Sequence, residues 1–343
     1  MPERHNQIDA FLDSAGWGNA DRHPLADDAS FRRYDRITEG ARRAVLMDAP
    51  PPKEDVRPFL KIAQKLTKLG YSAPVIYASD IDAGLLLLED LGDDTYTRVL
   101  ARTSEADTEW QLYALAVDFL VDLHRRPTDE TMPPDLLTYD EETLLAEALL
   151  FTDWYMPAVT GAETSADCCA SYVDAWRQVL APVLQVDATL VLRDFHVDNL
   201  ISLPERAGVA ACGVLDFQDA LAGHQAYDVM SLLEDARRDI DDDLVAAMMA
   251  RYLDALPDVN AVDFKRDFTI LAAGRHAKVI GIFTRLCRRD AKPDYLVHIP
   301  RVWRLLERAL AHPALAPVAT WMDRFMPPVD RIVPPVADLS PPR

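Results

Sequence analysis

Three polar side chains in the middle of the chain have types and spacing that suit the handling of phosphate. An apolar run from Leu190 leads to Asp194, Asn199 follows five residues later, and a second apolar run of strand character, Val209–Leu215, delivers Asp216. Asn and Asp oxygens are ligands that a hard cation such as Mg²⁺ prefers, and a carboxylate can orient a hydroxyl group and accept its proton. We therefore expect phosphoryl transfer, with Asp194 as the catalytic residue and Asn199 and Asp216 as metal ligands.

This order resembles the catalytic loop of protein kinases, H-R-D-x-x-x-x-N, followed by the D-F-G segment. Residues Leu192–Asn199 read L-R-D-F-H-V-D-N. They are also similar to the H-G-D-x-H-x-x-N loop of the aminoglycoside phosphotransferase-like kinases, with Leu192 in place of that family's first His. The resemblance implies that ATP is the phosphoryl donor and Mg²⁺ the metal. It further implies that Asp228 supports the catalytic loop without reacting itself. We expect the same of His196, while Asp219 is either a supporting residue or faces the substrate.

The composition is that of an ordinary globular protein, with 343 residues of which 49% are hydrophobic and 27% charged. A net charge of −20 argues against a nucleic-acid or anionic-membrane partner, because both require cationic patches. The sequence shows no signal peptide and no apolar run long enough to span a membrane. We expect a cytoplasmic monomer whose four cysteines are reduced, since they form no C-x-x-C pair.

The resemblance implies an α+β, bilobal protein-kinase-like fold, with a small antiparallel-sheet N-lobe and a larger, mainly helical C-lobe. The sequence fits this order, beginning with a short helix that carries Ile8 and Phe11 and continuing with a hairpin that turns at Gly40. In a kinase N-lobe such a hairpin covers the nucleotide phosphates. We expect residues 29–33 to cover the phosphates, so the candidate nucleotide-binding residues are Ser30, Phe31, Arg32 and Arg33.

Two charges of a typical kinase N-lobe are missing. The strand that ends V-L-M-D at Asp48 has no phosphate-binding Lys, and the following helix shows Phe59, Leu60 and Ile62 where a partner Glu would lie. Their joint absence is physically consistent, because either charge alone would be left unpaired in a partly buried site. The phosphate charge must then be met by Arg32, Arg33, Lys53 or the metal ions. The sequence does not choose among them.

A run of leucines bounded by turns, Gly84–Gly92, predicts a buried strand that continues into a linker. In the resembling family this linker is the hinge between the lobes, where backbone groups bind adenine, here near Glu89 to Leu91. The hinge places the N-terminal nucleotide-binding lobe at residues 1–92 and the helical C-lobe, with its catalytic loop and acceptor site, at 93–326. A Pro-rich tail, 327–343, should wrap the surface or stay loose.

The helix predicted over 141–155 ends in aromatic and acidic side chains that suit a carbohydrate pocket, because aromatic faces pack on sugar rings and carboxylates accept hydroxyl hydrogen bonds. Plain packing of a helix end in the core is the competing interpretation. A cation from the segment around Arg275 could reach the cleft, although a solvent-facing charge fits equally well. The candidate substrate-binding residues are Glu147, Asp153, Trp154, Tyr155 and Arg275.

Within the superfamily, several strings resemble the bacterial anomeric sugar kinases that phosphorylate N-acetylmuramate and N-acetylglucosamine at C1 during peptidoglycan recycling. The shared strings include A-S-F-R-R-Y at Ala29–Tyr34, L-F-x-x-W-Y at Leu150–Tyr155 and R-D-F-H-V-D-N-L at Arg193–Leu200. This resemblance implies ATP-dependent phosphorylation of the anomeric hydroxyl of an amino sugar. Two alternatives stay open, namely another small-molecule kinase of the same fold, acting on an aminoglycoside or choline-like alcohol, and a nucleotide-binding pseudokinase.

Overall fold

The computed structural model describes residues 2–25, 31–103 and 105–336. The chain forms two compact units. The first contains the residues up to Leu136 together with Leu192–Ala220, and the second contains Leu137–Val191 and the residues from Leu221 on. The segment with Asp194, Asn199 and Asp216 therefore belongs to the same unit as the N-terminal sheet. The lobe boundaries at 92 and 326 stay predictions, because this division follows compactness and not the hinge.

The first unit begins with a five-stranded antiparallel sheet, which confirms the fold predicted for the N-terminal part of the chain. Its strand order is β1-β2-β3-β5-β4. The predicted hairpin is β2–β3, and Gly40 at its turn has φ +61°, a left-handed conformation that glycine adopts without steric cost. The strands are β1 (Asp21–Pro24), β2 (Arg33–Glu39), β3 (Arg42–Asp48), β4 (Ile76–Asp80) and β5 (Leu85–Leu88).

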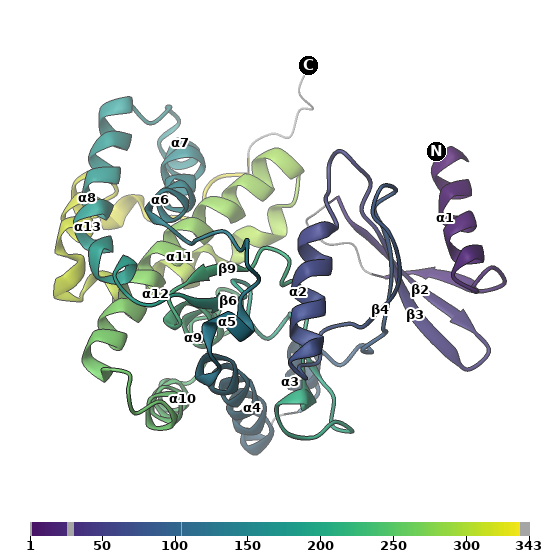
Figure 1. Cartoon of the computed structure of the whole chain (residues 1–343). Helices are drawn as coiled ribbons and strands as arrows, with labels where there is room; N and C mark the ends of the chain where they lie inside the picture. Colours follow the sequence, from purple (N-terminus) through teal and green to yellow (C-terminus); the bar gives the residue numbers. More distant parts are fainter. Residues whose placement is uncertain (1, 26–30, 104, 337–343) are drawn as a thin grey trace. The chain divides into compact units, whose positions relative to one another are not determined.

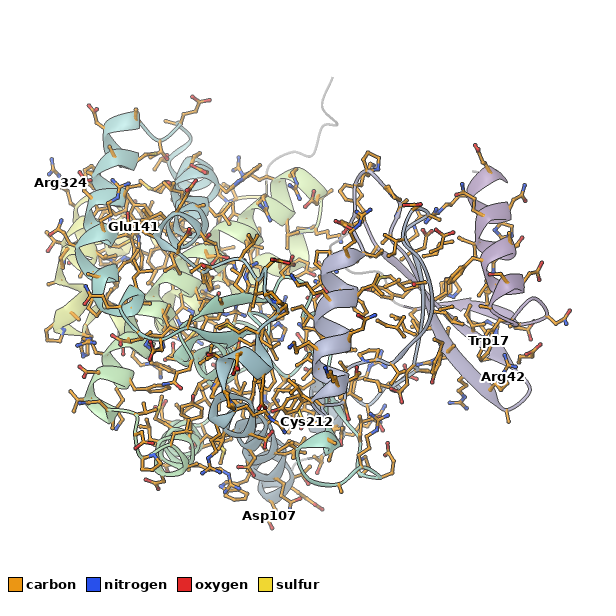
Figure 2. All side chains as sticks on the ribbon, viewed as in Figure 1. Trp17, Arg42, Asp107, Glu141, Cys212 and Arg324 are labelled. Atoms are coloured by element: carbon orange, nitrogen blue, oxygen red, sulfur yellow. The ribbon has the colours of Figure 1, made fainter. Side chains whose placement is uncertain are left out.

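Two helices lie on opposite sides of this sheet, α1 (Pro2–Ser14) and α2 (Arg57–Lys68) (Figure 1). The core under α1 combines Ile8 and Phe11 with side chains of one sheet face, among them Ile37. Figure 2 shows Trp17 beside Arg42, whose guanidinium lies 4.0 Å from the centre of the indole ring. This contact joins the loop that follows α1 to the first residue of β3.

Helix α2 is strongly amphipathic, because its apolar residues recur at helical spacing. Gly70, with φ +91°, follows the helix and ends it. As predicted, the buried face carries no acidic side chain at all. The buried residues of the helix are Phe59, Leu60, Ile62, Ala63 and Leu66.

The remainder of the first unit is helical apart from one short hairpin. That hairpin pairs β7 with β8, and a 3₁₀ turn occupies the start of the strand predicted over 209–215, so the strand itself is shorter than expected. The elements are α3 (Tyr96–Arg102), α4 (Ala106–Arg125), α5 (Thr128–Thr131), β7 (Leu200–Ser202), η2 (Gly208–Ala211) and β8 (Cys212–Val214).

All four cysteines are free thiols, as the sequence predicted. Cys212 on β8, labelled in Figure 2, is fully buried. Burial raises the pKa of its thiol to about 12, so the group stays protonated and unreactive at neutral pH.

The second unit is mainly helical, with one two-stranded sheet of β6 and β9. None of the described helices is both long and apolar enough to cross a membrane. Its elements are α6 (Glu141–Leu150), η1 (Phe151–Tyr155), α7 (Met156–Thr160), α8 (Ala166–Leu184), β6 (Thr189–Val191), β9 (Leu221–Gly223), α9 (Ala226–Leu233), α10 (Asp242–Ala255), α11 (Ala261–Asp290), η3 (Pro293–His298), α12 (Ile299–Leu310), η4 (Pro313–Leu315), α13 (Ala316–Phe325) and η5 (Pro328–Asp330).

A π-helical turn, η1, interrupts the helix predicted over 141–155. Pro157 has no N–H to donate to the carbonyl of Asp153, which removes one α-helical bond just beyond this turn. Gly281 of α11 lies against Leu150, the residue just before the π-turn. A Cβ at position 281 would be 2.3 Å from the carbonyl oxygen of Leu150. A larger residue at 281 would push α11 away from the π-turn.

The described part of the Pro-rich tail docks on the second unit. The buried hydroxyl of Tyr155 donates to the carbonyl of Ile332 at 2.7 Å and accepts from Nε1 of Trp303 at 3.0 Å. Arg331 donates to the carbonyl of Met326 at 3.0 Å. One phenol thus bridges η1, α12 and the tail.

We predict that Tyr155→Phe destabilises the protein by about 1–3 kcal/mol, because it leaves the indole N–H of Trp303 and the carbonyl of Ile332 without their partner in a buried site. Urea unfolding followed by tryptophan fluorescence measures this. Tyr77→Phe is the matched control, since Tyr77 is 52% exposed. Equal unfolding midpoints for Tyr155→Phe and wild type would contradict the bridging role.

Candidate active site

The hairpin of β7 and β8 brings the two predicted metal ligands together. Asn199 directly precedes β7 and Asp216 follows β8, so both stand at the same end of an antiparallel pair. The amide of Leu215 donates to the carbonyl of Asn199 at 2.9 Å, which extends the pairing to the two ligands themselves. The hairpin is tied to the N-terminal part of its unit, because the amide of Val214 donates to the carbonyl of Ser72 at 2.9 Å.

The loop before β7 is closed by its own hydrogen bonds. The amide of His196 donates to the carbonyl of Asp194 at 3.1 Å, and the amide of Asn199 donates to the carbonyl of His196 at 2.9 Å. Arg193 and Asp216 have φ of +70° and +57°, values that are uncommon for residues other than glycine. The backbone is thus strained next to Asp194 and at Asp216, a feature that clusters at functional sites.

Aromatic and polar contacts within the first unit hold this loop in place. The ring of Phe195 lies 5.4 Å from that of Phe119 on α4, which in turn lies 4.6 Å from the ring of Tyr71. The hydroxyl of Thr97 on α3 donates to the carboxylate of Asp198. His196 is buried, and its support of the catalytic loop stays a prediction.

The donor set suits a magnesium ion. The side-chain amide of Asn199 donates to the carbonyl of Asp194 at 2.9 Å, which leaves its oxygen as the group available to a cation. Asp216 adds a carboxylate with a side-chain exposure of 35%. Within the described residues no three His, Cys, Asp or Glu side chains gather as a closed metal cage. A site with few protein ligands fits Mg²⁺, which is commonly completed by water and substrate phosphates.

Gln218 is a residue of this site that the sequence analysis missed. Its amide nitrogen donates to Oδ1 of Asp216 at 2.7 Å and lies 3.4 Å from Oδ2 of Asp219. Gln218 is buried and Asp219 is exposed, so the amide is fixed and orients the carboxylates. The sequence signal was its position inside the L-D-F-Q-D string, two residues after a predicted metal ligand.

A cavity of about 360 Å³ in the first unit adjoins both predicted metal ligands. This volume falls within the range usual for small-molecule sites. The walls are largely apolar and suit a flat aromatic base. Asn199 and Asp216 are among the polar residues of the lining. The apolar lining residues include Val45, Phe59, Pro74, Leu88, Ile201 and Leu215.

The predicted hinge lines the same cavity. The amide of Glu89 donates to the carbonyl of Val75 at 2.7 Å, and its carboxylate pairs with Arg206, so the Glu89 side chain serves the structure. Within the part of the chain that the structure describes, the backbone amide and carbonyl of Leu91 make no hydrogen bond. Leu91 can therefore offer a donor and an acceptor to a ligand in the cavity.

Arg36, which the sequence analysis did not single out, also lines this cavity. Its guanidinium pairs with Asp90 and Asp93, with closest N–O distances of 2.8 Å to each. The hydrogen bond to Asp93 is the largest of the effects that raise the pKa of Arg36. The charge of Arg36 is thus balanced by the linker beyond β5.

Arg33, in the segment predicted to be the hairpin tip, pairs with Asp48 at the end of β2–β3 away from Gly40, so this placement of the tip was wrong. Strand geometry also separates the residues that were predicted to bind nucleotide. Ser30 lies outside the described residues, and Phe31 is 60% exposed. Side chains alternate between the two faces of a strand. Tyr34 and Arg36 line the cavity, so Arg32 shares their face, while Arg33 shares the opposite face with buried Ile37. This placement counts against the prediction that Arg33 binds nucleotide.

In the second unit, the structure brings two of the predicted substrate residues together. Glu147 pairs with Lys278, with 2.7 Å between Oε1 and Nζ, and also accepts a hydrogen bond from Tyr139. Glu147 and Arg275 line one small cavity, and Arg275 is largely buried, with its guanidinium 5.8 Å from the centre of the Tyr227 ring. The Glu147–Lys278 pair is a link that the sequence alone did not indicate.

For Tyr155 the structure supports the competing interpretation, packing of the helix end in the core. Tyr155 is fully buried and its hydroxyl is used by the tail, so its ring cannot stack on a sugar. The π-turn rotates the end of the helix, and leaves Asp153 exposed and Trp154 half-buried. Asp228 is fully buried in α9 of the second unit, and its predicted support of the catalytic loop stays a prediction.

Residues 21–264, more than half of the chain, match the model of the phosphotransferase enzyme family. The chain belongs to this family, and the protein is therefore a phosphotransferase.

Two relatives are similar to this chain over nearly its whole length. The chain is 38% identical to an N-acetylmuramate/N-acetylglucosamine kinase of Caulobacter vibrioides, over 95% of this chain and 97% of the relative. It is 39% identical to the kinase of the same description from Pseudomonas aeruginosa, over 91% and 94% of the two chains.

Two solved structures share the fold at low identity. A choline/ethanolamine kinase family protein from Mesorhizobium loti has a TM-score of 0.61 at 13% identity, covering 92% of this chain and 99% of the other. The ADP-bound aminoglycoside phosphotransferase APH(2'')-Ib has a TM-score of 0.53 at 16% identity, covering 90% and 98%.

We predict that Gln218→Met raises the Mg²⁺ concentration needed for half-maximal activity about tenfold, because the carboxylate of Asp216 loses the amide that orients it. A Mg²⁺ titration of turnover at saturating nucleotide measures this. Gln64→Met, an exposed residue on α2, is the matched control. An unchanged Mg²⁺ requirement for Gln218→Met would remove Gln218 from the site.

Proposed function

We propose that this kinase transfers the γ-phosphoryl group of ATP to the anomeric hydroxyl of an amino sugar, N-acetylmuramate and/or N-acetylglucosamine, in peptidoglycan recycling. The observation that carries the proposal is the placement of Asn199 and Asp216 on one cavity, directly after the loop of Asp194. The acceptor class is supported by relatives of that description at 38% and 39% identity over more than nine-tenths of this chain.

Phosphoryl transfer needs little from a protein beyond alignment and charge balance. Asp194 would hydrogen-bond the acceptor hydroxyl, hold it in line with the phosphoryl group and accept its proton late. The Asn199 oxygen and the Asp216 carboxylate would hold Mg²⁺, which neutralises charge on the nucleotide phosphates when bound. An anomeric hydroxyl is more acidic than an ordinary alcohol, so the basicity required of Asp194 is modest.

The purine of ATP would occupy the apolar part of the cavity. Its flat ring suits a space lined by Val45, Leu88, Ile201 and Leu215. The backbone of Leu91 supplies the polar contacts that an adenine edge requires. We assign the backbone carbonyl of Glu89 as a further polar contact of the adenine.

For the acceptor we retain Glu147, Asp153, Trp154 and Arg275 of the second unit. Asp153 and Trp154 are exposed or half-buried at the π-turn, which leaves them free to meet a ring and its hydroxyl groups. Arg275 carries the positive charge that the carboxylate of N-acetylmuramate would need. Its burial beside Tyr227 suits a group held in a defined position.

The test of this function is turnover with a panel of acceptors. Purified protein is incubated with Mg·ATP and, separately, N-acetylmuramate, N-acetylglucosamine, an aminoglycoside and choline, and products are observed by ³¹P NMR. A sugar 1-phosphate signal is expected for the amino sugars. Phosphorylation of only the aminoglycoside or choline would replace the proposal with another small-molecule kinase, and no product with any acceptor would favour a pseudokinase.

We predict that Asp194→Asn lowers turnover by at least about a thousandfold while nucleotide binding survives, because the amide can still accept a hydrogen bond but cannot take up a proton. Steady-state rates and calorimetric ATP titration measure the two effects. Asp187→Asn, an exposed residue outside the loop, is the control. Turnover near the wild-type rate in Asp194→Asn would eliminate Asp194 as the base.

We predict that Trp154→Ala raises KM for the sugar about tenfold and leaves KM for ATP within about twofold, since loss of a stacking face weakens only the acceptor. Initial rates with each substrate varied in turn give both constants. Trp110→Ala, on the exposed side of α4 in the first unit, is the matched control. An unchanged sugar KM would make Trp154 a packing residue.

A further inference from the structure

The strand that carries the phosphate-binding Lys in protein kinases cannot supply that charge here. β3 ends at Asp48, which is buried, and its carboxylate accepts a hydrogen bond from Nε of Arg4 at 3.0 Å. This pair joins β3 to α1. The end of the strand is therefore acidic and already paired, so the cation that meets the nucleotide phosphates must come from another element.

Three basic side chains near the hairpin are candidates, and the structure distinguishes them. Arg33 lies on the sheet face opposite the cavity, as its alternation with Arg32 and Tyr34 requires. Lys53 is exposed and its Nζ lies 4.4 Å from the centre of the Phe31 ring, in a cation–π contact. Arg32 remains, on the cavity face and largely buried, with a side-chain exposure of 13%.

Arg32 is held between two carboxylates of the same unit. Its Nε donates to Oε2 of Glu54 at 3.0 Å, while Nη1 lies 4.0 Å from Oδ1 of Asp216. The second oxygen of Glu54 accepts from the backbone amide of Phe31 at 3.2 Å. Glu54 therefore fixes both the guanidinium and the backbone just before it, and its own side chain is 12% exposed.

We propose that Arg32 and Glu54 form the phosphate-anchoring ion pair of this kinase. Arg32 directly precedes β2 and Glu54 lies in the loop before α2, and together they replace the Lys and Glu that other kinases carry on a strand and a helix. Arg32 would bind the nucleotide phosphates beside Asp216, and Glu54 is the positioning residue that holds Arg32. The inference rests on the proposed function only for the presence of a nucleotide in the cavity.

The chemistry of the pair suits this role. A guanidinium is always charged and presents several N–H donors in a fixed plane, so one edge can bind a carboxylate while another binds a phosphate. Glu54 engages the Nε edge, and the Nη1 group points toward the predicted metal ligand Asp216. Because the pair is largely buried, removal of Glu54 would leave Arg32 both misplaced and incompletely paired.

The test compares binding of ATP with binding of adenosine, since only ATP carries the phosphates. Competition against a fluorescent ATP analogue in the presence of Mg²⁺ gives both affinities for the full chain. We expect Arg32→Ala and Glu54→Gln to weaken ATP binding about tenfold to a hundredfold and to leave adenosine binding within about twofold. Arg32→Lys should fall between Arg32→Ala and wild type, because it keeps the charge and loses the fork.

The double variant Arg32→Ala/Glu54→Gln tests whether Glu54 affects ATP binding only through Arg32. If Glu54 acts through Arg32, the double variant binds ATP no more weakly than Arg32→Ala alone. Additive losses, equal losses for ATP and adenosine, or unchanged ATP binding in both single variants would each overturn the proposal. If Arg32→Ala does not fold, as thermal unfolding will reveal, Arg32→Lys takes its place in the same comparison.

Two neighbouring residues provide matched controls. Asp55 and Arg57 form an exposed ion pair at 3.2 Å, next to Glu54 in the chain. Asp55→Asn and Arg57→Ala should leave the ATP-to-adenosine ratio unchanged. The measurement does not involve the sugar, so failure of the acceptor assignment and failure of this pair give different results.

Discussion

The antiparallel pairing of β7 and β8 is the constraint on which the candidate active site depends. It places Asn199 and Asp216 at one end of a hairpin, and the bond from Leu215 to Asn199 keeps their backbones in register. A slip of one residue would turn one of the two side chains to the other face. The hairpin needs support because it is short, and it receives this support from Ser72 and from α3 through the bridge of Thr95 with Ile201.

Charge balance organises the remainder of the cavity along one strand. On β2 and just before it, Arg32 and Arg36 share a face, and each meets a carboxylate from a loop, Glu54 for the first and Asp90 for the second. Strand β2 and the residue before it thus provide one cation near the predicted metal ligands and another beside the predicted hinge. Burial makes such pairs costly to break, and this gives both ends of the cavity a defined geometry.

Much of the site could be predicted from the sequence because its signals are local. The order of Asp194, Asn199 and Asp216 after apolar runs, the Gly40 turn and the amphipathic α2 each depend on neighbouring residues only. What the sequence could not decide depends on three-dimensional placement.

The choice of Arg32 over Arg33 required the face of β2, which buried Ile37 fixes. The sequence left Tyr155 open between a carbohydrate pocket and packing in the core, and only its burial beside the π-turn decides for packing. Glu54 carries no recognisable pattern, since its partner is known only once the loop before α2 is folded.

The first unit is built from two segments that are separated in the sequence, and this affects how it folds during synthesis. The unit needs residues up to Leu136 and also Leu192–Ala220, and the amide of Val214 closes onto Ser72. During synthesis the N-terminal sheet leaves the ribosome well before its catalytic hairpin, and the whole of Leu137–Val191 emerges in between. The carbonyl of Ser72 therefore lacks its partner, the amide of Val214, for that interval. A polypeptide truncated near the predicted hinge would lack part of the first unit, including the predicted metal ligands Asn199 and Asp216.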